Sequence, residues 1–161
     1  MRLWTPAYVA IGSNLDDPKA QVEAAFQSLA GLEAVRLLAR SRLYRSVPLG
    51  PQDQPDFVNA AAGLLTQLSA RELLLQLKQL EATVGRVKSQ RWGPRRIDFD
   101  LHVFGAERIA EPDLTVPHPG VSVRNFVLYP LADIAPDLLV PGHGRVRELA
   151  RRVGPAGLAL L

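Results

Sequence analysis

The order of strand-like and helix-like segments constrains the fold of this chain most strongly. Four segments, at residues 4–12, 34–46, 57–67 and 97–105, carry the β-rich or alternating pattern that is typical of strands. Apolar residues at helical spacing separate the first strand from the second and the third from the fourth. The order β-α-β-β-α-β predicts an α+β, ferredoxin-like core in which two helices cover an antiparallel sheet.

Capping residues mark the ends of both predicted helices. Asp17 is expected to cap the start of the first helix, and Gly31 to end it. Ser69 followed by Glu72 has the spacing of a capping box ahead of the second helix. We expect that helix to end at Gly85.

The last third of the chain is predicted to add to this core. A proline-rich loop around "TVPHPG" precedes a helix near residues 121–132, and a short basic helix at 145–153 precedes an apolar tail. We expect these additional C-terminal helices to cover the other face or an edge of the sheet. No repeat or linker interrupts the chain, so residues 1–161 are predicted to form a single domain.

Composition excludes several classes of protein. The chain has 161 residues, a formal net charge of +3 and no cysteine, which rules out disulfides, thiolate metal sites and a cysteine nucleophile. No apolar run approaches the ~20 residues of a membrane span, and the apolar run near the N-terminus is too short for a secretory signal. These features predict a cytoplasmic protein with no membrane partner.

Asp98 and Asp100 form the first candidate site. On a strand, residues two apart point to the same face, so the two carboxylates are predicted to lie close together while Ile97, Phe99 and Leu101 pack against the core. Like charges held so close repel each other unless a cation lies between them. Mg²⁺ binds through one or two carboxylates together with substrate phosphates. The alternative is a pair of solvated aspartates on an exposed strand face.

A basic loop directly precedes this strand. Residues 85–96 contain Arg86, Lys88, Arg95 and two further arginines, with no acidic residue among them. A polyphosphate would explain why basic residues and aspartates stand next to each other in the sequence, because the anion attracts the arginines and its metal attracts the aspartates. A solvated loop is the alternative. No P-loop or G-x-G-x-x-G motif occurs, so any nucleotide must be bound by another arrangement.

Other side chains are weaker candidates. Trp92 can stack on a heterocycle or simply anchor the basic loop. His118, between two prolines, can serve a phosphate or a proton transfer, or bond only to backbone. His102 shares the predicted strand face of the aspartates, although imidazole is a less expected ligand for Mg²⁺. Asn59 can read the edge of a heterocycle and Phe57 can stack on its ring, or both can serve only the local structure.

Several stretches together resemble one family. "AIGSNL", "YRSVPLGPQDQPDFVNA", "RWGPRRIDFDLHVFG", "TVPH" and "RNFVLYPLADIAP" are similar, in this order, to the motifs of the 6-hydroxymethyl-7,8-dihydropterin pyrophosphokinases. The resemblance runs from about residue 6 to residue 140. It implies a ferredoxin-like core and transfer of pyrophosphate from ATP to the hydroxymethyl group of a pterin in folate biosynthesis, with release of AMP.

The resemblance also implies roles for particular residues. Asp98 and Asp100 would bind two Mg²⁺ ions that bridge the ATP phosphates, and Arg86 and Arg95 would stabilise charge during transfer. The implied ATP-binding residues are Glu81, Lys88, Trp92, Arg95, Leu101, Thr115, His118 and Arg124. The implied pterin-binding residues are Ser46, Leu49, Phe57, Asn59, Trp92 and Phe126. Lys88 stands where the family has a second arginine, so a bidentate phosphate contact there would become a point charge. Pro119 stands where the family has an aromatic residue, so the resemblance implies no contact from that position.

Two other classes of function compete with this interpretation. Ferredoxin-like sheets also bind RNA through aromatic residues and basic loops, but no stretch here fits the RNP1 pattern. A purely structural or regulatory domain of the same fold is the other alternative. The expected partners are therefore two small molecules, ATP and the pterin, with no nucleic acid, and the chain is expected to be a monomer.

Overall fold

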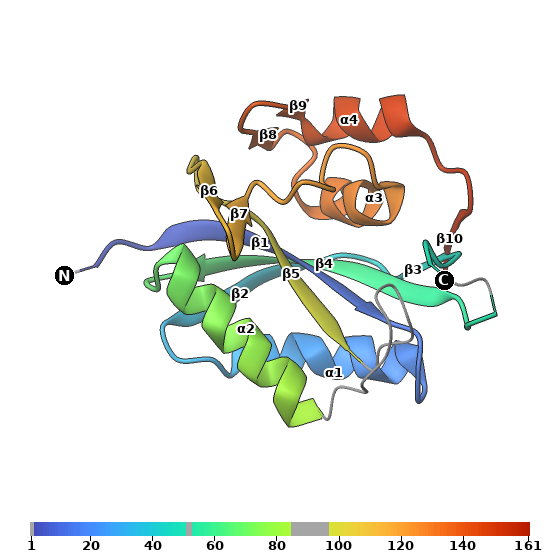
Figure 1. Ribbon diagram of the computed structural model, residues 1–161, viewed down its shortest axis with the longest axis horizontal. Helices are drawn as coiled ribbons and strands as arrows, with labels where there is room; N and C mark the ends of the chain where they lie inside the picture. Colours follow the sequence, from blue (N-terminus) through green and yellow to red (C-terminus); the bar gives the residue numbers. More distant parts are fainter. Residues whose placement is uncertain (1, 51–52, 85–96) are drawn as a thin grey trace.

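A computed structural model describes residues 2–50, 53–84 and 97–161. A six-stranded sheet lies between two helical layers, with α1 and α2 on one face and α3 and α4 on the other (Figure 1). The helices are α1 (Pro18–Ala30), α2 (Ala70–Val84), α3 (Asn125–Ile134) and α4 (Val146–Val153). The strands of the sheet are β1 (Thr5–Ser13), β2 (Val35–Arg40), β3 (Tyr44–Ser46), β4 (Phe57–Thr66), β5 (Asp98–Phe104) and β10 (Leu158–Leu160). Two small hairpins complete the described elements: β6 (Ile109–Glu111) with β7 (Leu114–Val116), and β8 (Leu139–Val140) with β9 (Gly144–Arg145).

The strand order confirms the predicted ferredoxin-like arrangement. β5 lies at one edge, followed by β1 and β4, and both β2 and β3 pair with β4 on its far side. All these pairings are antiparallel. The C-terminal β10 pairs with β3, so the apolar tail extends the edge of the sheet.

The predicted strand over residues 34–46 is wrong in one respect, because it is divided into β2 and β3. The break begins at Ser41, whose backbone N–H donates to Ala61 O (2.9 Å) while its Oγ accepts the Ala61 N–H (2.8 Å). The hydroxyl thus replaces a backbone carbonyl in the ladder. Pairing with β4 stops at Arg40 and resumes at Tyr44, which lies opposite Asn59.

The predicted helix starts are confirmed. The Asp17 carboxylate accepts the Ala20 N–H at 3.4 Å, and Gly31 follows the last residue of α1. In the capping box, the Ser69 N–H donates to Glu72 Oε1 (2.9 Å) and the Glu72 N–H donates to Ser69 Oγ (3.1 Å). The end predicted at Gly85 falls outside the described residues.

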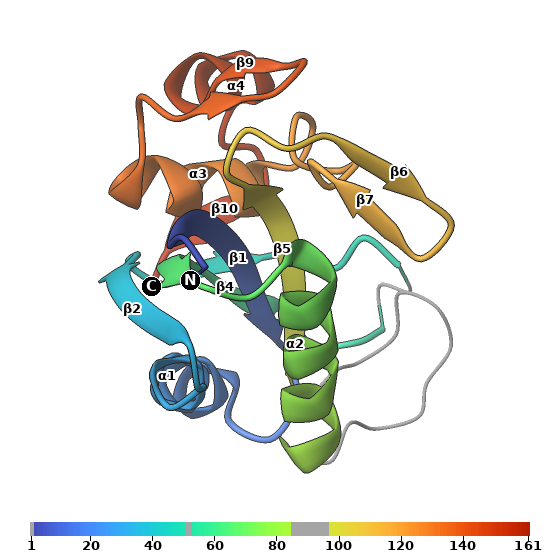
Figure 2. The same cartoon turned by 90° about the vertical axis from the view of Figure 1, so that its left-hand side faces the viewer.

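Two apolar layers hold the sheet between the helices. The layer under α1 and α2 contains Phe26, Leu73 and Phe99, whereas the layer under α3 and α4 contains Val103 and Leu128. Figure 2 shows the two pairs of helices on opposite sides of the sheet, with the β6–β7 hairpin extending beyond β5. None of the described helices is long and apolar enough to cross a membrane.

The C-terminal segments differ from prediction in detail. The helix expected near residues 121–132 begins only at Asn125. The backbone N–H groups of Val121 and Val123 instead donate to His118 O (3.0 Å) and Gly120 O (3.2 Å), in turns that follow the two prolines. The proline-rich loop also contains the β6–β7 hairpin, which the sequence pattern does not indicate. The short basic helix is confirmed as α4, which packs on α3.

Candidate active site

Antiparallel pairing brings Asn59, Gly12 and Asp98 into one row across the sheet. Gly12 on β1 lies opposite Asn59 of β4 on one side and opposite Asp98 of β5 on the other. Two strand spacings therefore separate Asn59 from Asp98, about 10 Å between their Cα atoms. A side chain at Gly12 would point to the face of Asn59, because its Cβ would lie 3.6 Å from Asn59 Oδ1. Because Gly12 has no side chain, no side chain of β1 stands between the Asn59 amide and the Asp98 carboxylate in this row.

Asp100 occupies the next row on the same face. It lies opposite Ala10 of β1, whose other neighbour is Ala61 of β4. Phe99 and Leu101 point the other way, into the apolar layer under α1 and α2. The alternation thus holds both aspartates on the α3 side of β5, as the sequence predicts.

Glu81 on α2 adds a third carboxylate beside this strand. It follows Leu73 and Leu77 on the buried face of the helix and is only 1% exposed. Its Oε2 accepts the Phe99 N–H at 2.8 Å. Glu81 therefore binds the outer edge of β5 at the residue that separates Asp98 from Asp100. Burial raises the pKa of Glu81, and the charge of Asp98 raises it further.

This concentration of negative charge determines the electrostatics of the site. Burial, followed by the charge of Asp98, raises the pKa of Asp100 from 3.8 to about 7, and Glu81 contributes in the same direction. Lys78, whose Nζ lies 3.6 Å from Glu81 Oε1, and Arg124 oppose the shift only in part. A divalent cation would relieve the repulsion, and carboxylate oxygens are the ligands that Mg²⁺ prefers. The residues present therefore fit a magnesium site.

The raised pKa of Asp100 leads to a testable pH dependence of stability. The folded protein holds this proton between pH 3.8 and about 7 while the unfolded chain has lost it, so Asp100 makes the fold less stable as pH rises through this window. Asp100→Asn should therefore gain stability relative to the unsubstituted protein on going from pH 5 to pH 8. Urea unfolding of both proteins with a chelator measures this difference, in which the groups that do not interact with Asp100 cancel. A difference that does not change with pH would contradict the prediction.

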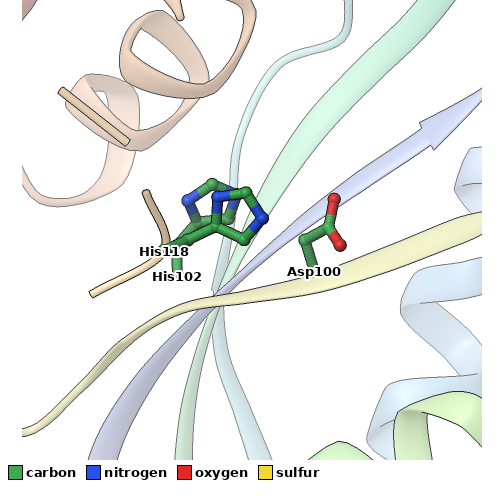
Figure 3. A group of neighbouring side chains, drawn as sticks. All are labelled: Asp100, His102 and His118. Atoms are coloured by element: carbon green, nitrogen blue, oxygen red, sulfur yellow. The ribbon is translucent and has the colours of Figure 1, made fainter. Parts of the chain in front are cut away.

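Two histidines lie next to Asp100. The register shifts between Tyr8 and Val9, which leaves His102 as an extra residue of β5 in a β-bulge. The His102 carbonyl accepts the His118 N–H at 2.9 Å, and the two ring centroids are 4.4 Å apart. Figure 3 shows both rings on the same side of β5 as the Asp100 carboxylate.

The protonation of His118 follows from its surroundings. Burial, and then the charge of Arg124, lower the pKa of His118 to about 4, so the ring is neutral at pH 7. Its Nδ1 accepts the Gly120 N–H at 3.0 Å, which leaves the proton on Nε2. Arg124 lies across Gly120, where an added Cβ would come within 2.5 Å of Arg124 Nε. This end of the site thus presents a neutral N–H donor and a cation.

Asn59, Ser46 and Phe57, three of the predicted pterin-binding residues, lie at the other end of the row. Asn59 is buried, and its Nδ2 donates to Ser46 Oγ at 2.7 Å and to Tyr44 O at 3.4 Å. Phe57 is half-buried on the same face of β4, and Phe126 packs against the apolar layer under α3. These contacts fix the orientation of the Asn59 amide.

The remaining predicted site residues are less closely grouped. Leu49 is exposed on the loop after β3, and Thr115 is exposed on β7. The Leu101 side chain is in the core under α1 and α2, so it does not lie on the face of the two aspartates. Four predicted residues lie outside the described ranges: Arg86, Lys88, Trp92 and Arg95.

Some contributors were missed by sequence reasoning. Gly12 was noted only within "AIGSNL", and its place between Asn59 and Asp98 depends on strand register. Asn14 is buried just after β1, and its Nδ2 donates to Gln54 Oε1 and Pro55 O, both at 2.9 Å. These bonds tie the end of β1 to the loop that leads into β4. In the sequence, the signal for Asn14 is only an asparagine close after a predicted strand.

The fold and the site together define a class of protein. It is a ferredoxin-like α+β protein with a carboxylate cluster suited to a divalent cation, a cationic and imidazole end, and a fixed amide across the sheet. Residues 8–136 match the family described as 7,8-dihydro-6-hydroxymethylpterin-pyrophosphokinase. The chain belongs to this family.

Curated relatives agree with this assignment. The chain is 49% identical over 142 residues to the 2-amino-4-hydroxy-6-hydroxymethyldihydropteridine pyrophosphokinase of Pseudomonas aeruginosa, with 88% of each chain covered. It is 44% identical over 146 residues to the enzyme of the same name from Haemophilus influenzae, with 91% of each covered. Coverage of this extent means that the similarity includes most of the chain.

A solved structure supports the fold independently. The Plasmodium falciparum HPPK-DHPS crystallised with pteroate aligns with a TM-score of 0.73 over 94% of this chain, at 13% identity. The chain spans 43% of that longer protein. At this identity the likeness shows the fold alone.

Proposed function

We propose that the chain transfers the pyrophosphoryl group of ATP to the hydroxymethyl oxygen of 6-hydroxymethyl-7,8-dihydropterin, releasing AMP, in folate biosynthesis. The single observation that carries this proposal is the row Asn59–Gly12–Asp98, which places a fixed amide and the Asp98 carboxylate on the same face of the sheet. A pterin held by the amide would direct its hydroxymethyl group along the row toward the carboxylates. The names of the curated relatives agree with this chemistry.

Asp98 and Asp100 are the residues that would hold Mg²⁺. When bound, the ion would supply positive charge that offsets the charge of the phosphates. By holding that ion, the two carboxylates would help to position the phosphates with the β-phosphorus toward the pterin hydroxyl. The hydroxyl oxygen bonds to the β-phosphorus as the bond from that phosphorus to the oxygen shared with the α-phosphorus breaks, AMP leaves with that oxygen, and the hydroxyl proton is released to solvent. Phosphoryl chemistry of this kind depends mostly on positioning and charge.

The other residues of the site would orient the two substrates. His118 would donate its Nε2–H to the nucleotide, and Arg124 would add a positive charge at the same end. Asn59 would read the polar edge of the pterin, with Phe57 and Phe126 against its ring. Arg86 and Arg95 would reach the phosphates, a role that rests on the resemblance of "RWGPRR" to the family motif.

The decisive experiment is to measure AMP formed from ATP with and without the hydroxymethyl pterin. We expect AMP and the pterin diphosphate in equal amounts, and no AMP with a pterin that lacks the hydroxymethyl group. Formation of ADP in place of AMP, or AMP production that does not require the pterin, would reject the proposal. Binding of single-stranded RNA at physiological salt would instead favour the RNA-binding alternative.

Arg95→Ala gives a prediction for the basic loop. If Arg95 stabilises charge mainly in the transition state, its removal should lower kcat by at least ~10²-fold and change the dissociation constant of ATP far less. Steady-state kinetics together with equilibrium binding of a non-hydrolysable ATP analogue separate the two quantities. An increase in KM at unchanged kcat would show that Arg95 contributes only to binding in the ground state.

Three further proposals concern the whole chain. We propose one domain over residues 1–161, since α3 packs on β4, α4 packs on α3 and β10 pairs with β3. We propose that the chain works as a monomer, because the row of site residues needs no second copy. A cytoplasmic location is proposed because ATP is a substrate and the sequence has no cysteine.

A further inference from the structure

Asp100, His102 and His118 form a cluster whose composition differs from that of the aspartate pair. One potential ligand atom from each residue lies within 4.8 Å of the other two (Figure 3). One ligand is a carboxylate and two are imidazoles. Hard cations such as Mg²⁺ prefer oxygen, whereas imidazole suits zinc, cobalt and nickel. The cluster therefore has the chemistry of a transition-metal site.

His102 supplies a second, independent observation. Its ring is 1% exposed, and neither ring nitrogen has a hydrogen-bond partner in the part of the chain that the structure describes. Polar groups buried this deeply nearly always have a partner, so an orphaned imidazole needs an explanation. A ligand shared with Asp100 and His118 would provide one, since the bulge turns this ring to their side of β5.

We propose that Asp100, His102 and His118 bind one divalent transition-metal ion, with zinc as the representative of the class. The proposal goes beyond the pyrophosphokinase function and does not depend on it, because it concerns the chain without nucleotide. Three protein ligands leave at least one coordination position for water.

The geometry requires the three side chains to move inward. Ligand atoms around one tetrahedral zinc ion lie about 3.4 Å apart, so the widest pair must close by up to about 1.4 Å. His118 must also give up one hydrogen bond. If the ion binds Nδ1 it displaces the Gly120 N–H, and if it binds Nε2 the ring proton must move to Nδ1. Either choice exchanges one hydrogen bond for a metal–nitrogen bond.

The shared ligands have a consequence for the reaction. Asp100 and His118 are also proposed to position Mg²⁺ and the nucleotide, so zinc and the Mg²⁺–ATP complex compete for them. Zinc should therefore inhibit AMP formation, and the inhibition should weaken as Mg²⁺–ATP is raised.

The test is titration of the full chain with zinc chloride by calorimetry, in excess Mg²⁺ and without nucleotide. We expect one zinc ion per chain, and at least ~10²-fold weaker binding in both His102→Leu and His118→Leu. His143→Leu is the matched control, since His143 is exposed on the β8–β9 turn and is the only other histidine of the sequence. Unchanged zinc affinity in His102→Leu, or equal loss in His143→Leu, would overturn the proposal.

A spectroscopic measurement avoids dependence on the folding of His102→Leu. The three histidines give three imidazole signals by NMR, assigned with the His118→Leu and His143→Leu variants. Zinc should shift the signals of His102 and His118 and leave that of His143 in place. Binding that moves neither of the first two signals would assign the ion to carboxylates alone and reject the site. AMP formation with Mg²⁺ alone reports on the pyrophosphokinase function separately.

Discussion

Asp98→Ala and Asp100→Ala should each reduce turnover by at least ~10³-fold while the protein remains folded. A loss of this size corresponds to about 4 kcal/mol of transition-state stabilisation, within the range expected for losing a metal ligand in phosphoryl transfer. The fold should tolerate both changes, because Phe99 and Leu101, not the aspartates, pack against the helices. Removing either carboxylate also relieves repulsion within the cluster that includes Glu81.

AMP formation at saturating ATP and Mg²⁺ measures the effect, and circular dichroism and thermal unfolding verify the fold. Glu107→Gln is the matched control, because Glu107 is an exposed carboxylate just beyond the end of β5. It should retain full activity. Near-normal turnover with Mg²⁺ in either aspartate variant would reject the assignment of the metal ligands.

Local sequence patterns were sufficient to predict most elements of the fold. Asp17 and the pair Ser69 and Glu72 act within a few residues of themselves, so their capping interactions can be identified without knowledge of the fold. The break between β2 and β3 could not be identified in this way. It depends on a hydrogen bond from Ala61 to the Ser41 hydroxyl, and Ala61 is 20 residues away in the sequence.

The candidate site likewise has features that local sequence predicts and features that it does not. That Asp98 and Asp100 share a face follows from the period of a strand alone. The bulge at His102 and the row that joins Asn59 to Asp98 depend instead on the register of strands paired across the sheet.

For Glu81 the sequence gives two conflicting indications. Its spacing from Leu73 and Leu77 predicts a buried position on the helix, whereas its charge predicts an exposed one. Its hydrogen bond to the edge of β5 and its ion pair with Lys78 account for both.

Gly12→Ala should lower kcat/KM for the pterin by about 100-fold with little change in stability. The added methyl group fits the fold, since its nearest neighbours would be Asn59 Oδ1 at 3.6 Å and Phe57 Cδ1 at 3.8 Å. The same methyl group would lie on the sheet surface between Asn59 and the aspartates. In the proposed arrangement, the pterin extends across this surface to reach the phosphates. A displacement of about 1 Å at the reacting centre is sufficient for a 100-fold loss.

Gly63→Ala is the matched control for this substitution. Gly63 is also in the sheet, opposite Tyr8, and a Cβ there would meet Ala39, Tyr8 and Ile134 at 3.5–3.6 Å. Both variants therefore add one methyl group at ordinary contact distance, but only Gly12 lies beside Asn59 and Asp98. Gly63→Ala should keep its activity, and Gly12→Ala should still bind a non-hydrolysable ATP analogue with Mg²⁺ normally. If Gly12→Ala turned over the pterin as well as Gly63→Ala does, the substrate could not lie along this row, and the proposed direction of the hydroxymethyl group would be wrong.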